Sequence, residues 1–150
     1  MAPEIFESQP FDGHAIDKWA LGPILFALLS NIVLPWEKPW RRMNTNFDIF
    51  CRGSQEQLVE WVRSFWLNHN SKERLRRVGF NEDSWVALWF ERKNGTDQWQ
   101  STPCFSLFRQ ICRYDPRDRL SLRQVRNHAW MNPIVEGKLS LNMNMYKFFF

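Results

Sequence analysis

A helix that is apolar on nearly all sides is the feature that most constrains this chain. Between about His14 and Ser30 the sequence has helical spacing, and its large apolar residues surround the helix axis. A helix of this kind belongs in the interior of a larger structure, because no face of it is suited to water. Pro23 removes one backbone donor and is expected to kink it slightly. The sequence therefore predicts that the Ile16–Leu29 helix is the most buried element.

The same region contains an uncharged run, Ala20 to Trp36, that has to be compared with a membrane span. A spanning helix needs roughly 20 mainly apolar residues. This run is shorter and contains Gly22, Pro23 and Pro35, which interrupt helices. We therefore expect a buried core helix and no membrane partner, with a membrane-associated helical protein kept as an alternative.

Other segments also carry helical patterns. Ser54 and Gln57 form a capping-box pattern, and the segment behind them has the clearest amphipathic period in the chain. Its apolar face consists of Leu58, Val59, Trp61, Val62, Phe65 and Trp66. Further short helices are predicted for Phe47–Arg52, for Ser71–Val78, and after Thr102 and Ser121.

Two segments have no clear helical period. Gly79–Gln100 is ambiguous, because tryptophans and alanine alternate in it and Asn94-Gly95 is a turn signal. Residues 134–150 have no period, and we interpret them as a loose tail. The expected fold class is mainly α, with four to six helices and no extensive sheet.

Charge and cysteine content limit the partners and the compartment. The net charge is +4, and the densest basic run, Lys72–Arg77, reads as the solvated face of a short helix, so no nucleic-acid partner is expected. Cys51, Cys104 and Cys112 are odd in number and form no CxxC pair, which favours reduced thiols. The first residues lack the basic head and apolar run of a signal peptide. The expected location is therefore cytoplasmic or nuclear.

Three short motifs stand far apart in the chain. They are Ala2-Pro3-Glu4, then Asp17-Lys18-Trp19-Ala20-Leu21-Gly22 with Pro35-Trp36 behind it, and finally Asp115–Ser121 followed by His128-Ala129-Trp130. They match A-P-E, D-x-W-[SA]-x-G with P-[FW], and D-P-x-x-R-x-[ST] with H-x-W. In this order they resemble the eukaryotic-type serine/threonine protein kinase domain, from A-P-E onward. Among the branches of this family, the sequence most resembles the calcium/calmodulin-dependent and AMP-activated kinase-like branches.

The resemblance implies a partial kinase domain over residues 1–133, namely an incomplete helical C-lobe. It implies a buried ion pair between Glu4 and Arg119 that pins the activation segment to the helical lobe. In the family, the counterpart of Asp17 accepts hydrogen bonds from the catalytic loop, and here it is expected to cap its own helix instead. The remaining motif residues with expected structural roles are Trp19, Gly22, His128 and Trp130.

Two departures from the family pattern stand out. Asn31 occupies a position where the family usually has Gly. The region around 68–103 is longer and richer in Trp than the family pattern, which suggests an insertion.

The residues that perform chemistry in the resembled family are missing from this chain. Phosphoryl transfer needs a glycine-rich loop, a strand Lys, an H-R-D base and a D-F-G Asp that holds magnesium. None of these motifs occurs in the sequence. We therefore expect no catalytic, cofactor-binding or metal-binding residues, with ATP and Mg²⁺ and a protein substrate implied only for the complete parent domain.

The expected partner is the missing N-terminal part of the kinase domain. Without it, the chain is expected to be inactive and either poorly soluble or loosely packed, because one flank of the Ile16–Leu29 helix loses its cover. The alternative interpretation is a non-catalytic helical interaction module that presents its Leu58–Trp66 face to a partner.

Overall fold

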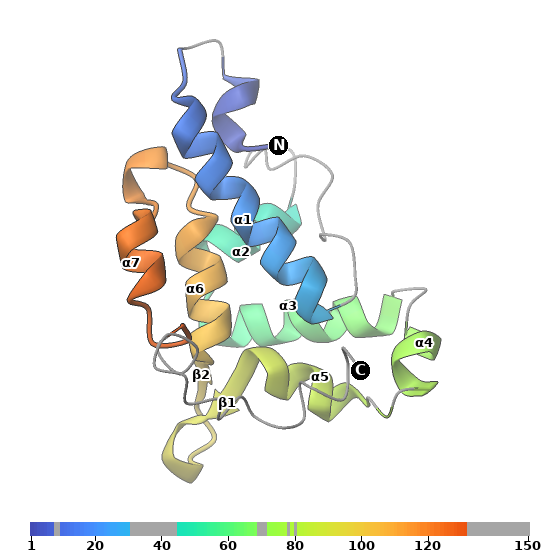
Figure 1. The fold of residues 1–150 in the computed structure, drawn as a ribbon. Coiled ribbons are helices and arrows are strands. Elements are labelled where there is room, and N and C mark those ends of the chain that lie inside the picture. The colour runs from blue at the N-terminus through green and yellow to red at the C-terminus, as the bar shows by residue number, and fades with distance from the viewer. Residues whose placement is uncertain (8–9, 31–44, 69–71, 78, 80, 132–150) are drawn as a thin grey trace.

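The structure, a computed structural model, describes residues 1–7, 10–30, 45–68, 72–77, 79 and 81–131 (Figure 1). Within these ranges it confirms the predicted mainly α fold class, since only one small two-stranded sheet accompanies the helices. The α-helices are α1 (Gly13–Ser30), α2 (Thr45–Arg52), α3 (Gln55–Asn68), α4 (Lys72–Arg77), α5 (Glu82–Trp89), α6 (Pro103–Ile111) and α7 (Leu122–Arg126). The 3-10 turns are η1 (Pro3–Phe6), η2 (Lys93–Gly95) and η3 (Pro116–Asp118), and the strands are β1 (Phe90–Arg92) and β2 (Trp99–Ser101). The expected tail, 134–150, lies outside the described residues.

The described ranges hold seven α-helices, one more than the upper limit of six predicted from the sequence. The additional helix is α5, in the segment that was ambiguous. Asn81 caps it, because its side chain accepts a 2.8 Å hydrogen bond from the backbone N–H of Ser84. The alternation of Trp85, Ala87 and Trp89 left this segment ambiguous, but Trp85 and Trp89 lie one turn apart on the buried face of this helix.

The expectation that the Ile16–Leu29 helix is the most buried element is wrong. α1 packs mainly on α6, which it crosses in Figure 1 (α1 blue, α6 orange). Its opposite face is open to solvent, and 40–58% of Leu21, Ile24 and Leu28 is exposed. The most buried helix is α6, where five of nine residues are buried. None of the helices in the described ranges combines the length and hydrophobicity that crossing a membrane requires.

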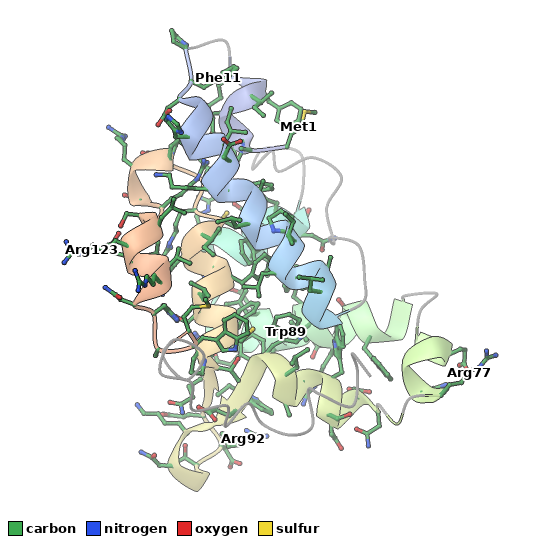
Figure 2. The ribbon with its side chains drawn as sticks, viewed as in Figure 1. Met1, Phe11, Arg77, Trp89, Arg92 and Arg123 are labelled. Atoms are coloured by element: carbon green, nitrogen blue, oxygen red, sulfur yellow. The ribbon has the colours of Figure 1, made fainter. Side chains whose placement is uncertain are left out.

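The core is dominated by aromatic side chains that α6 gathers from several helices. Phe105 and Phe108 of α6 are fully buried, as are aromatic residues of α1, α2 and α5. The ring of Phe26 stacks on Trp89 with centroids 5.1 Å apart, and Figure 2 shows Trp89 inside the molecule. Arg77, Arg92 and Arg123 lie at its periphery in the same view. The aromatic core is thus closed within the described part of this chain.

The apolar face of α3 lies inside this core. Leu58, Val59, Trp61, Val62 and Trp66 each expose 5% or less of their surface. The indole N–H of Trp85 donates to the carbonyl of Val62 over 3.0 Å, which ties α5 to this face. The interaction-module hypothesis finds no support at this surface, because the five residues of the face that the structure describes are buried in the core.

The hairpin between α5 and α6 falls in the predicted insertion. β1 and β2 pair antiparallel, and the Asn94-Gly95 turn signal marks the bend, where both residues have positive φ. Trp99 holds the hairpin against α3. The guanidinium of Arg92 lies 3.9 Å from the centre of its ring, and that of Arg63 in α3 lies 5.7 Å away.

Candidate functional site

Glu4 and Arg119 form a buried ion pair, although 115 positions separate them in the sequence. The two guanidinium Nη atoms of Arg119 lie 2.6 Å from the two carboxylate oxygens of Glu4, one on each. The Arg119 side chain is fully shielded from solvent, and that of Glu4 is 10% exposed. The ion pair expected from the sequence is therefore present, in the bidentate geometry in which arginine binds carboxylates most strongly.

Arg119 also binds three backbone carbonyls. Its Nε donates to the carbonyl of Arg113 over 2.9 Å, and its Nη atoms donate to the carbonyls of Ala15 and Tyr114 over 2.9 and 3.1 Å. With the two bonds to Glu4, these bonds engage all five N–H donors of the guanidinium. Arg119 thus joins η1, the first turn of α1 and the segment after α6, and none of its donors is left unpaired.

The local sequence places Arg119 at this junction. Asp115 caps η3 by accepting a 2.9 Å hydrogen bond from the backbone N–H of Arg117. Hydrogen bonds from the Arg117 guanidinium and backbone lower the pKa of the Asp115 carboxyl to about 2, so Asp115 is ionised at neutral pH. This charged 3-10 turn ends at Arg119. The side chain of Arg119 then turns inward toward Glu4.

Gly22 lies where α1 packs tightly against the C-terminal end of α6. A Cβ atom built on Gly22 would lie 2.2 Å from the Sγ atom of Cys112 and 3.3 Å from a methyl group of Ile111. Cys112 is fully buried and its Sγ donates weakly to the carbonyl of Trp19, so the sulfur has little room to move. The glycine in the second motif is therefore required by helix packing.

Gly22→Ala is expected to lower the free energy of unfolding by about 1–3 kcal/mol, because the added methyl group overlaps a closed interior. Chemical unfolding followed by Trp fluorescence measures the change. Gly13→Ala is the matched control, since nothing lies within 4 Å of its added Cβ. In a Cys112→Ala background the Gly22→Ala penalty should shrink, because the overlapping sulfur is gone. An equal penalty in both backgrounds would contradict the contact.

Asp17 and Trp19 lie on opposite faces of α1. Asp17 is exposed, and within the described ranges no donor pairs with its carboxylate. The expectation that Asp17 caps its own helix is wrong, because Asp12 does so by accepting a 3.0 Å hydrogen bond from the backbone N–H of His14. Trp19 is 2% exposed and belongs to the core.

His128 and Trp130 fold the segment after α7 back onto α6. The backbone N–H of Trp130 donates to Nδ1 of His128 over 3.2 Å, so Nδ1 is the unprotonated ring nitrogen. The other ring nitrogen lies 3.4 Å from the side-chain amide nitrogen of Gln110 in α6. Burial lowers the pKa of His128, which keeps the ring neutral at neutral pH. Trp130 is half-buried against the core.

These residues form a structural frame rather than a set of reactive groups. Within the described part of the chain, no three His, Cys, Asp or Glu side chains are grouped so that they could hold a metal ion. The two most buried thiols are poor nucleophiles, because burial raises the pKa of Cys104 to about 12 and that of Cys112 also well above its ordinary value. The arrangement can fix the relative positions of three chain segments, which is a structural task.

A family model described as the protein kinase domain matches residues 1–131. The chain belongs to the protein kinase family. It is 30% identical over 93 residues to CBL-interacting serine/threonine-protein kinase 24 of Arabidopsis thaliana. The aligned residues make up 59% of this chain and 20% of that protein. It is 23% identical over 149 residues to serine/threonine-protein kinase SIK2 of Gallus gallus, covering 98% of this chain and 13% of the relative. No solved structure matches the chain.

The kinase chain thus spans a fifth or less of the length of these two relatives. The match to the family model includes all three motifs and the hairpin region. Sequence reasoning identified Glu4 and Arg119, but it missed the carbonyls of Ala15, Arg113 and Tyr114, since backbone acceptors leave no signal in side-chain identity. It expected one flank of the Ile16–Leu29 helix to lose its cover, but it did not identify the residues of the open stripe, which are Asp17, Leu21, Ile24 and Leu28.

Proposed function

We propose that this chain is the segment of a serine/threonine protein kinase domain that begins at A-P-E, and that it completes a helical C-lobe. The observation that carries the proposal is the Glu4–Arg119 pair, because it joins two motifs of the family at the positions where the resemblance requires it. The complete domain would transfer phosphate from MgATP to serine or threonine hydroxyls of proteins. The chain alone is proposed to be inactive and to reside in the cytoplasm or nucleus.

The partner in this proposal is the upstream part of the same kinase domain. The face of α1 that carries Asp17, Leu21, Ile24 and Leu28 supports it, because these exposed residues follow one another at intervals of three and four along the helix. Three large aliphatic side chains would be covered by an apolar surface of the upstream part, and the Asp17 carboxylate at one end would accept hydrogen bonds from its backbone. A surface of this kind suits an intramolecular contact within one domain.

ATP and magnesium belong to the upstream part in this proposal. The sequence has no G-x-G, H-R-D or D-F-G motif, so none of its residues is assigned to a phosphate or to a metal. What the chain contributes is the frame that fixes A-P-E through Glu4. Its effect on catalysis is to position the activation segment, and the chemistry resides in residues that it lacks.

Joining the chain to its upstream coding sequence tests the proposal. We expect in-frame codons for H-R-D and D-F-G in the transcript before Met1, and we expect phosphorylation of serine- and threonine-containing peptides with labelled MgATP only in the joined protein. Calorimetry of the isolated chain with MgATP should give no heat of binding. Saturable MgATP binding by the isolated chain would reveal a site that the sequence does not show. A transcript without these codons would contradict the fragment proposal.

A further inference from the structure

A pocket of about 500 Å³ lies on the side of α6 that faces α2, next to the segment after α6 that Arg119 holds. Pockets of this volume are of the size that holds small molecules or single side chains of a partner. Its wall contains three positively charged residues, Arg52, Arg109 and Arg113, and two negatively charged ones, Asp115 and Asp118. None of the kinase motifs uses the three arginines.

Two of these positive charges have no carboxylate partner within the described ranges. Arg52 is paired with Asp48, and the Asp115 carboxylate is engaged by Arg117. Arg109 donates instead to the backbone carbonyls of Phe50 and Cys51, over 3.1 and 3.2 Å. These two bonds use two of its five N–H groups, so three donors remain for a ligand.

Arg113 follows Arg109 four residues later, just beyond the end of α6, and it is exposed. The pKa of the half-buried Arg109 guanidinium is lowered, first by burial and then by the positive charge of Arg113. Two like charges that repel each other at a pocket wall are both stabilised by an anion placed between them.

The side chain of Arg109 and the backbone of Arg113 are held in place. Arg109 is fixed by the two carbonyls at the end of α2, and the backbone of Arg113 is fixed by the 2.9 Å bond from Arg119 to its carbonyl. Tyr114, which also lines the pocket, donates its hydroxyl to Glu7 over 2.7 Å. The Arg109 guanidinium is therefore positioned before a ligand arrives, which lowers the entropy cost of binding, while the exposed Arg113 side chain closes on the ligand from a fixed backbone.

We propose that Arg109 and Arg113 make this pocket a binding site for a phosphate monoester, either a phosphorylated serine or threonine side chain or a free phosphate compound. Two separate guanidinium groups suit three phosphate oxygens better than the two oxygens of a single carboxylate. Asp118 is the opposing charge at the pocket wall, and it limits the affinity. The inference does not depend on the proposed function, because neither Arg109 nor Arg113 belongs to the Glu4–Arg119 pair or to the α1 stripe.

The test is a calorimetric titration of the full chain at constant ionic strength. The ligands are a short phosphoserine peptide with no other charged side chain, the same peptide with serine or glutamate in place of phosphoserine, and inorganic phosphate. We expect saturable binding of the phosphorylated ligands alone. Arg113→Gln should weaken it about tenfold, since it removes a charge-assisted bond without touching the described core. Arg123→Gln, on α7 at the periphery of Figure 2, is the matched control and should leave binding unchanged.

Asp118→Asn should strengthen phosphate binding about threefold, because it removes a negative charge from the pocket wall. A variant that had lost its fold could not bind more tightly, so this result separates binding from folding. A phosphopeptide that binds at least tenfold more tightly than inorganic phosphate identifies a protein side chain as the ligand, and equal affinities identify a free phosphate compound. Equal binding of the serine peptide, no saturable binding by a chain whose near-UV circular dichroism shows a fold, or no gain with Asp118→Asn would overturn the proposal.

Discussion

Glu4→Gln lowers the free energy of unfolding by about 3–5 kcal/mol, the usual cost of leaving one partner of a buried ion pair without the other. The substitution retains the shape of the side chain but removes its charge, and the fully shielded Arg119 guanidinium then has only neutral oxygens around it. Whole domains are stable by about 5–15 kcal/mol, so this single change removes a large share of the stability. Chemical unfolding at micromolar concentration, followed by Trp fluorescence, measures it.

Glu73→Gln is the matched control for this prediction. Glu73 pairs with Arg76 over 2.8 Å, but their side chains are 64% and 54% exposed. The same chemical change there should cost less than about 1 kcal/mol, because water screens the exposed pair. If both substitutions changed the stability equally, the buried pair would not be the frame of this fold.

Most of the helices could be predicted because their signals are local. Ser54 with Gln57, Thr102 before Pro103, and Ser121 with Gln124 all cap the helices that were predicted behind them. α5 could not be predicted in the same way. In its capping box the third helical residue is Ser84, where glutamate or glutamine is usual. The alternation of its two tryptophans around Ala87 also hides a short helix.

The position of α1 in the fold was predicted wrongly for a physical reason. A sequence shows that a helix is apolar all round, but it does not show how many of its faces the same chain can cover. α6 covers the face with Trp19, Gly22 and Phe26, and the aromatic core closes around α6 instead. The Glu4–Arg119 pair was predictable because the family motifs that contain the two residues are specific, whereas the three carbonyls around it depend on backbone geometry.

Of the two outcomes expected for the isolated chain, poor solubility is the one that the structure supports. The buried aromatic rings are packed within the chain, so loose packing of the whole core does not follow. Leu21, Ile24 and Leu28 nevertheless form an exposed stripe, and leaving them about half uncovered forgoes about 2–4 kcal/mol of burial. An apolar stripe of this kind promotes association between copies of the chain until a partner covers it.

Ile24→Lys should therefore act in opposite directions on the isolated chain and on the complete domain proposed above. Alone, the variant should remain monomeric at concentrations where the original chain associates, because a charge then stands in the middle of the stripe. When the upstream part is supplied in trans, the same charge becomes buried without a partner, which should weaken the complex more than a hundredfold. Light scattering measures the first effect and recovered kinase activity the second.

Leu122→Lys is the matched control, since Leu122 is 63% exposed on α7, outside the stripe, and its substitution should alter neither association nor recovered activity. An Ile24→Lys chain that still assembled into an active kinase would show that the upstream part binds elsewhere.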